Sequence, residues 1–461
     1  MSLRNILSPV FYIPGLLLMF TGCTKFIELD PPPTALVNET VFLDSSSANA
    51  AVLGMYTRMM QSNFSVFNGG LALYGSLLSD EIKATGNQTN TREFYNHAVL
   101  PANTQVRNMW LELYQQIYQA NAILEGLENA VTLSPALQQR LKGEACLMRS
   151  LCYFQLVQLF GPVPLVRVTD YRLNRLAERA DTVRIYDQMV EDATRAATYL
   201  PDNFAVYQGQ RTRPNKYAAK ALLAQLYLYG KDWSGAFAAA SEVIDASSLF
   251  NLAANPANAF ALNGPEAIWQ LQPVLTGNNT GVALAFVQSA NVPVYGSLQP
   301  GLWNLFEEDD LRRVNWTYTY SFNGNTYHIP YKYKFRLQSA GIEYLSLFRL
   351  AEIFLIRAEA LAHLGDLEGS HGDLSHIRTR AGLSTPEITD IDAMLAAIAR
   401  ERQLELFTEN GYRWMDLKRT GQANTVLQGL KPGAWKTTAV LLPIPITEIN
   451  NNPKLYQNEG Y

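Results

Sequence analysis

Residues 221–235 read Ala221-Leu-Leu-Ala224-Gln-Leu-Tyr227-Leu-Tyr-Gly-Lys-Asp232-Trp-Ser-Gly235, and residues 354–369 read Phe354-Leu-Ile-Arg-Ala358-Glu-Ala-Leu361-Ala-His-Leu-Gly-Asp366-Leu-Glu-Gly369. In each segment a small residue, Ala224 or Ala358, precedes an aspartate by eight positions, and the second segment follows the first by 134 residues. Both patterns predict a helix, a tight turn around Gly and Asp, and a second helix that crosses the first at the alanine.

These two units are similar to tetratricopeptide-like helical hairpins, which bury a continuous apolar face only when they stack. They are irregular and far apart, so we expect them to be parts of one α-superhelical framework. Apolar residues recur at spacings of three and four over much of the chain, which predicts a mainly α protein. The expected helices cover residues 48–60, 106–130, 135–160, 182–200, 214–229, 233–246, 345–364, 367–381 and 390–408.

The sequence changes character between about residues 250 and 344, where Asn, Gly, Pro and aromatic residues are frequent. Aromatic and polar residues alternate from Trp316 to Phe322, Asn323-Gly324 supplies a turn, and a second alternation runs from Tyr327 to Phe335. This pattern predicts a small β-hairpin within an irregular, loop-rich half of the protein. Loops and hairpins on a rigid scaffold are common places for recognition.

The first residues have the pattern of a secretory signal. Arg4 is followed by an apolar stretch and then by Thr21-Gly22-Cys23. The stretch is too short to span a bilayer and contains a proline, so we expect residues 1–22 to be removed. Small residues before a cysteine resemble a bacterial lipobox, which implies lipidation of Cys23. An ordinary signal peptide followed by a free cysteine is the alternative.

A proline-rich segment follows the predicted lipidation site. Residues 30–34 read Asp-Pro-Pro-Pro-Thr, and proline stiffens the chain in an extended conformation. We therefore expect a lipidated N-terminus and spacer over residues 23–45, and a single folded domain over residues 46–461 that contains the loop-rich region at about 250–344. The lipid would hold this domain at a membrane without a transmembrane helix.

Composition excludes some functions and leaves others open. Lys and Arg number 37 against 41 Asp and Glu, a net charge of −4 that gives no reason to expect a nucleic-acid partner. The 24 Tyr and 7 Trp supply flat surfaces suited to core packing or to stacking on sugars. Cys146 and Cys152 would lie about 9 Å apart along one helix, too far for a disulfide, so we expect buried thiols.

Four segments in order resemble the SusD/RagB family. They are Leu141 to Leu165 with its Phe160-Gly161-Pro-Val-Pro164 turn, Arg349 to Ala360 with Ile377 to Gly382, Glu401 to Arg419, and Leu442-Pro443-Ile-Pro445 through Asn452-Pro453 and Gln457-Asn458 to Tyr461. With the lipobox, the resemblance covers essentially the whole chain. Glu409-Asn410-Gly411 has one residue more than the commoner Glu-Gly pairing of the family, which suggests a subfamily difference.

The resemblance implies a tetratricopeptide-like superhelix that supports a loop-rich half. It also implies a lipid-anchored protein of the cell outer membrane, facing outside, that captures glycans or other nutrients such as peptides. Such a protein hands its ligand to a SusC-like TonB-dependent β-barrel transporter and uses no cofactor.

Several charged residues near the C-terminus have two interpretations. Glu401, Arg402, Glu405, Arg413, Asp416 and Arg419 could be catalytic carboxylates with a cationic clamp, but a structural lattice of ion pairs is simpler because Arg pairs with carboxylates in a fork. Asp309 and Asp310 with Arg312 suit an ion pair near the base of the hairpin. The chain has no recognisable metal or catalytic motif, so we expect no enzyme and no metal site.

A sugar site should join an aromatic platform to hydrogen-bonding groups. By contrast, the tryptophans of framework segments, Trp233, Trp269 and Trp414, are predicted core residues. An α-helical glycoside hydrolase and a scaffold that binds only protein are the competing hypotheses. The candidate ligand-binding residues are Tyr74, Asp80, Trp303, Trp316, Tyr318 and Tyr320.

Overall fold

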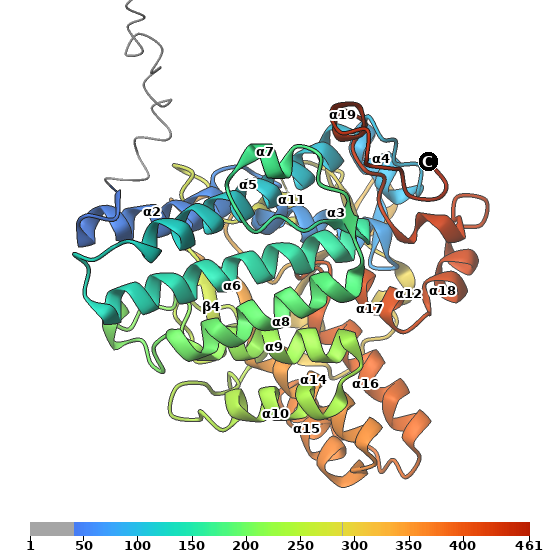
Figure 1. Cartoon of the computed structure of the whole chain (residues 1–461). Helices are drawn as coiled ribbons and strands as arrows, with labels where there is room; N and C mark the ends of the chain where they lie inside the picture. The colour runs from blue at the N-terminus through green and yellow to red at the C-terminus, as the bar shows by residue number, and fades with distance from the viewer. Residues whose placement is uncertain (1–40, 288) are drawn as a thin grey trace, which may run out of the picture.

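The computed structural model describes residues 41–287 and 289–461 (Figure 1). The predicted signal peptide, Cys23 and nearly all of the spacer lie outside these residues. The helices of the first half are α2 (Ser45–Met60), η1 (Val66–Gly70), α3 (Leu71–Leu78), α4 (Thr89–Tyr95), α5 (Thr104–Glu128), α6 (Pro135–Phe160), α7 (Tyr171–Asn174), α8 (Thr182–Tyr199), η2 (Ala205–Tyr207), α9 (Lys216–Gly230) and α10 (Trp233–Ile244).

The second half contains shorter helices before the last long ones. They are η3 (Pro256–Asn258), α11 (Gly281–Phe286), α12 (Pro300–Trp303), α13 (Leu311–Asn315), α14 (Leu350–Leu364), α15 (Leu367–Arg380), α16 (Ile391–Leu406), α17 (Tyr412–Arg419), α18 (Ala423–Leu430), η4 (Thr437–Val440) and α19 (Ile446–Asn451). The mainly α fold expected from the sequence is confirmed.

The long helices stack in chain order. α5 packs on α6, α6 on α8, α8 on α9, α9 on α10, α10 on α14, and α14 on both α15 and α16. Figure 1 shows α6, α8 and α9 as neighbouring layers, with α10, α14 and α15 continuing below them. Each helix therefore buries its apolar face against the next helix of the stack, as stacked hairpins require.

The two repeated units of the sequence form two matching helical hairpins, α9–α10 and α14–α15. Asp232 caps α10 by accepting a 2.9 Å hydrogen bond from the backbone N–H of Gly235. Asp366 caps α15 in the same way, by accepting a 2.9 Å hydrogen bond from the backbone N–H of Gly369. A Cβ on Gly235 would lie only 2.6 Å from its capping carboxylate, and one on Gly369 only 2.7 Å, so glycine is required at this position in both turns. The predicted hairpins are confirmed.

Four two-stranded antiparallel sheets complete the loop-rich half and its surroundings. β1 (Ile82–Ala84) pairs with β5 (Gly296–Leu298), β2 (Val163–Pro164) with β3 (Arg179–Ala180), β4 (Ala267–Leu271) with β8 (Leu345–Arg349), and β6 (Thr317–Phe322) with β7 (Asn325–Pro330).

The prediction of a single helix over residues 345–364 is wrong at its start, where β8 precedes α14. Every residue of β8 is buried, and a short apolar run that is covered on both faces has no periodicity to distinguish strand from helix. α3, all of whose residues are buried, was likewise not predicted.

Most of the expected core residues lie in the core. Cys146 and Cys152 are buried free thiols, as predicted, and burial raises the pKa of Cys146 to about 12. Trp269 and Trp414 are buried, at 0% and 2% exposure. Trp233 is only half-buried, which corrects the prediction for this residue.

Candidate ligand-binding site

The predicted β-hairpin is present and projects an aromatic surface. Phe322 pairs with Asn325 across the turn, which leaves Asn323 and Gly324 as a two-residue loop. Their φ angles of 47° and 76° are both left-handed, as a type I′ turn requires. The turn therefore fixes the register of the two strands, and Tyr320 lies directly opposite Tyr327.

Four tyrosines line up along one side of this hairpin. The ring centres of Tyr318 and Tyr320 are 5.9 Å apart at an interplanar angle of 27°, and Tyr320 lies 5.4 Å from Tyr327. Tyr331 extends the row, 5.9 Å from Tyr318. Tyr318 is 45% exposed. We call Tyr318, Tyr320, Tyr327 and Tyr331 the tyrosine ladder. The other three tyrosines are half-buried, and the hydroxyl of Tyr320 is buried without a hydrogen-bond partner in the described residues. The ladder is thus a row of partly exposed rings.

The face of the hairpin opposite the tyrosine ladder packs against Trp303. His328 and Thr319 lie opposite each other on this face, and the Oγ1 of Thr319 is 2.8 Å from the Nδ1 of His328. The His328 ring stacks on Trp303 with a centre separation of 3.7 Å and an angle of 10°. Arg313 lies 4.7 Å from the centre of the same indole. The Trp303 ring is thus covered by both His328 and Arg313, so this residue steadies the hairpin more than it offers a platform.

Trp316 does not belong to the exposed surface. It ends α13 with φ −113° and ψ 4°, so its side chain leaves the alternation that begins at Thr317. The ring is 1% exposed, and its Nε1 donates a 2.8 Å hydrogen bond to the carbonyl of Pro256. The prediction of Trp316 as a ligand contact is therefore wrong, because no ligand reaches a ring enclosed in this way.

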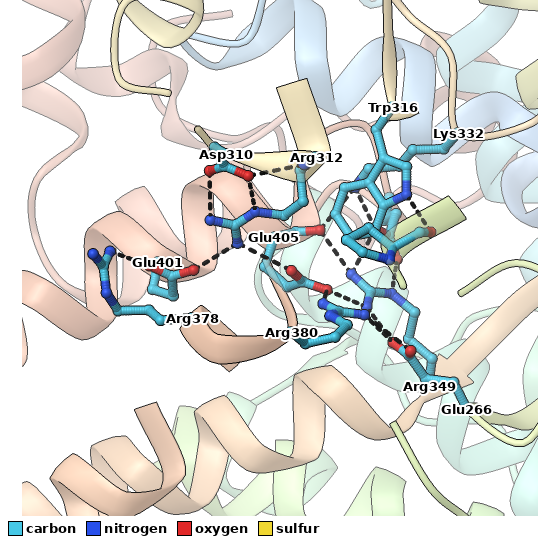
Figure 2. A network of polar contacts seen from close by, with 12 residues as sticks. Glu266, Asp310, Arg312, Trp316, Lys332, Arg349, Arg378, Arg380, Glu401 and Glu405 are labelled. Atoms are coloured by element: carbon cyan, nitrogen blue, oxygen red, sulfur yellow. Dashed lines mark hydrogen bonds and ion pairs between the residues drawn. The ribbon is translucent and has the colours of Figure 1, made fainter. Parts of the chain in front are cut away.

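A buried ion-pair network anchors the hairpin at this tryptophan. Figure 2 shows Trp316 and Lys332 beside a chain of arginines and carboxylates. Glu405 lies at its centre and accepts hydrogen bonds from three arginines, Arg312, Arg349 and Arg380. Since Arg312 begins the hairpin segment while Glu405 belongs to α16, the network joins the hairpin to the helical framework.

Each arginine of the network also pairs with a further carboxylate, although the Nε of Arg380 has no partner within the described residues. Arg312 contacts Asp310 at 2.8 Å and Glu401 at 2.6 Å, which confirms the ion pair predicted for Asp310. Arg349 and Arg380 both reach Glu266, at 2.8 and 2.9 Å. All of these side chains are buried. Buried charges need such partners because each loses its hydration on folding.

The charges of the network set its titration. Burial alone would raise the pKa of Glu405, but Arg380, Arg349 and Arg312 hold it well below its usual range. Burial lowers the pKa of Lys332 to about 8, although Glu409 opposes this shift. A second group of ion pairs lies nearby: Arg402 and Arg419 both bind Asp416 and hold its pKa at about 2 against the effect of burial. The interpretation of the C-terminal charges as a structural lattice is confirmed.

The two remaining candidates lie apart from the ladder. Tyr74 is 6% exposed and packs on Phe94 with ring centres 4.5 Å apart, so its selection as a ligand contact is wrong. Burial raises its pKa above the usual range. Asp80 is half-buried, and both of its carboxylate oxygens accept 2.7 Å hydrogen bonds from Arg413. The carboxylate of Asp80 is therefore already paired with Arg413 of α17.

Of the predicted site residues, the structure brings together only Tyr318, which is exposed, and Tyr320, which is half-buried. Tyr327 and Tyr331 belong to the same row and were missed. The signal for Tyr327 was in the sequence, because a two-residue Asn-Gly loop places residues 320 and 327 opposite each other. Tyr331 directly follows β7, and the alternation predicted from Tyr327 to Phe335 places it on the same face as Tyr327.

Two other findings concern the described part of the chain. No helix within residues 41–287 and 289–461 is long and apolar enough to cross a membrane. In the same ranges, no group of three or more His, Cys, Asp or Glu side chains is arranged to hold a metal ion.

Comparisons with known proteins cover most of the chain. A family model described as "Starch-binding associating with outer membrane" matches residues 33–228, and the model described as "SusD family" matches residues 301–461. SusD-like protein P25 of Formosa agariphila is 26% identical over 538 aligned positions, which cover 100% of each chain. The starch-binding protein SusD of Bacteroides thetaiotaomicron is 38% identical over 125 residues, 25% of this chain and 21% of that protein.

Solved structures show the same fold. A SusD superfamily protein from Bacteroides vulgatus superimposes with a TM-score of 0.80 at 22% identity, covering 91% of this chain and 99% of that one. A laminarin-binding SusD-like protein gives a TM-score of 0.75 at 24% identity, over 90% and 99% of the two chains. The two family models, the full-length relative and the shared fold agree with the ordered motifs of the sequence. The chain belongs to the SusD/RagB family.

Proposed function

We propose that this protein is a cell-surface receptor that binds an oligosaccharide and delivers it, unaltered, to a SusC-like TonB-dependent outer-membrane transporter. The tyrosine ladder is the observation that carries the proposal. A pyranose ring has an apolar C–H face and a rim of hydroxyl groups, so it stacks on flat rings that carry polar edges. A row of such rings matches successive sugar units of a chain.

The rigid root of the hairpin supports this role. Binding costs conformational entropy when a surface must be ordered, and a preformed platform avoids much of that cost. The network around Glu405 and the stack of His328 on Trp303 hold the root and the middle of the hairpin against the framework. The ladder is therefore ordered before the ligand arrives.

Binding is favoured over catalysis by the state of the carboxylates. A glycosidase needs two carboxyl groups on either side of the scissile bond. Asp80, Asp310, Glu401 and Glu405 all form ion pairs with arginines. A hydrolase would have to break these pairs to use them.

The location and partner follow from the family. One matching family model is described as associating with the outer membrane, and a laminarin-binding protein shares the fold. Lipidation of Cys23 would supply the anchor.

The test is electrophoresis of the mature protein in native gels cast with a panel of polysaccharides, with reducing ends scored in parallel. Retardation by one glycan without new reducing ends is the expected result. Release of reducing ends would overturn the non-enzymatic role. Indifference to every glycan would overturn the sugar ligand and favour a peptide nutrient or a scaffold that contacts only protein.

A further inference from the structure

A groove of about 920 Å³ is lined mainly by helices and by none of the residues of the tyrosine ladder. It is formed by the end of α9, the start of α10, and parts of α14, α16, α17 and α18. Figure 1 shows α10, α14, α16 and α17 grouped together in the lower part of the molecule. Its lining includes Trp233, which stacks on His363 at a ring separation of 3.8 Å and an angle of 10°.

The two repeated hairpins differ in their turns, and the turn of the first hairpin, between α9 and α10, lines this groove. At the residue that ends the first helix, the α14–α15 unit has Gly365 with φ 86°, while the α9–α10 unit has Lys231 with φ 61°. A left-handed φ is less favourable for a lysine than for a glycine, because the lysine carries a Cβ. Two positions later, Leu367 of one unit corresponds to Trp233 of the other. Lys231 and Trp233 both line the groove, and the strained lysine has no structural advantage over the glycine of its sister turn.

The charges around the groove are unbalanced. Its two carboxylates, Glu359 and Asp416, are both bound to arginines, Arg419 contacting each of them. Five other lysines and arginines line the groove, and two of them, Arg402 and Arg413, are paired with Asp416 and Asp80.

The remaining three cations of the groove are Lys231, Arg400 and Lys418. Within the described ranges no carboxylate forms an ion pair with any of the three. Burial lowers the pKa of Lys418 to about 7, and its Nζ donates to the carbonyl of Gln158, so Lys231 and Arg400 are the cations left for a ligand.

We infer that this groove is a second ligand site and that it takes an acidic oligosaccharide, with its carboxylate at the unpaired cations and a sugar ring against the stacked Trp233 and His363. The excess of positive charge selects an anion. The aromatic pair and the volume suit two or three sugar units. The choice of a sugar over another organic anion rests on the proposed function, whereas the preference for an acid rests on the groove alone.

The test uses trigalacturonate and an alginate trimer, each compared with its own methyl ester, which keeps the sugar chain and removes the charge. The mature protein labelled with ¹⁵N in its tryptophans reports binding through the indole signal of Trp233, assigned from Trp233→Phe. We expect at least one acid to shift this signal, its ester to bind at least tenfold more weakly, and the affinity to fall as salt rises.

Lys231→Gly is the decisive variant, because it removes the cation and restores the residue of the sister turn. Stability should rise while affinity for the acid falls at least threefold. Lys436→Gln removes an exposed lysine that does not line the groove and should change neither. Equal binding of acid and ester, unaltered binding by Lys231→Gly, or no binding of either acid overturns the inference. None of these outcomes would affect the retardation of another glycan that depends on Tyr318 and Tyr320. The proposed function is therefore tested independently of the groove.

Discussion

The carboxyl group of Glu81 is fully buried and has no ion-pair partner among residues 41–287 and 289–461. Its Oε2 accepts hydrogen bonds from the Oγ of Ser76 at 2.6 Å and from the backbone N–H of Thr408 at 3.2 Å, while its Oε1 has no partner in the described chain. Burial raises the pKa of Glu81 to about 7. In the unfolded chain the same group titrates near 4.5. The native state therefore binds one more proton than the unfolded state between these two values.

This residue predicts a pH dependence of stability. Its protonated form contributes fully below pH 4.5, and the contribution is lost as pH rises through 7, because the ionised form is then buried. Glu81→Gln fixes the neutral form, and its amide nitrogen takes the place of the unpartnered oxygen. We expect the free energy of unfolding of the variant, relative to that of the parent, to be higher at pH 8 than at pH 5. The difference should be on the order of a few kcal/mol.

Urea unfolding at both pH values measures this difference. Glu387→Gln, at an exposed carboxylate, is the matched control and should show no such change. A stability difference between Glu81→Gln and the parent that is identical at pH 5 and pH 8 would mean that Glu81 is ionised in the native state throughout.

Single residues also show how far the sequence predicts the site. Tyr318 and Tyr320 were predictable because alternation in a strand fixes which side chains share a face. Trp316 has the same parity but lies in the last turn of a helix, and Tyr74 lies in an apolar helix that is buried on all sides. Burial of these rings depends on tertiary contacts, which composition and spacing do not contain.

At the scale of elements, the hairpin depends on its two ends. Its root is held by the network around Glu405, where three arginines share one carboxylate. Its tip is held by the Asn323-Gly324 turn. The repeated turns at Asp232 and Asp366 were predictable because they are local, whereas β8 was not, since its partner strand β4 lies far away in the sequence.

Removal of the central charge should loosen the root. Glu405→Gln leaves Arg312, Arg349 and Arg380 without their shared anion, and breaking a buried pair costs about 3–5 kcal/mol. We expect a loss of this size in denaturant unfolding, against a change within about 0.5 kcal/mol for the exposed control Glu387→Gln. A variant as stable as the parent would show that the network has no structural role.

Distortion of the tip should loosen only the hairpin. Nothing lies within 4 Å of a Cβ built on Gly324, so Gly324→Ala acts through the φ of 76° and costs about 1 kcal/mol. Hydrogen exchange of the amides in β6 and β7 should accelerate while exchange in α6 stays unchanged. Gly301→Ala, which also meets open space but has no left-handed φ, is the control. Unaltered exchange in both strands would contradict the type I′ turn.

At the scale of the whole molecule, stacked helices form a frame that carries a small aromatic hairpin. The frame was predictable from helical periodicity, and the ordered motifs, which lie mainly on its helices and turns, are specific enough to indicate the family. The arrangement of the loop-rich half was not predictable, because its short strands pair with partners distant in sequence. The central claim that remains is functional: the tyrosine ladder binds the sugar.

The most direct measurement is isothermal titration calorimetry of the mature protein with the glycan that retards it most. We compare the parent with the double variant Tyr318→Ala/Tyr320→Ala and with Tyr171→Ala, which removes a tyrosine that is 71% exposed on α7. Loss of two stacking rings should weaken binding by about tenfold or more, with melting temperature and Tyr171→Ala binding unchanged. A double variant that binds the glycan as tightly as the parent would contradict the account.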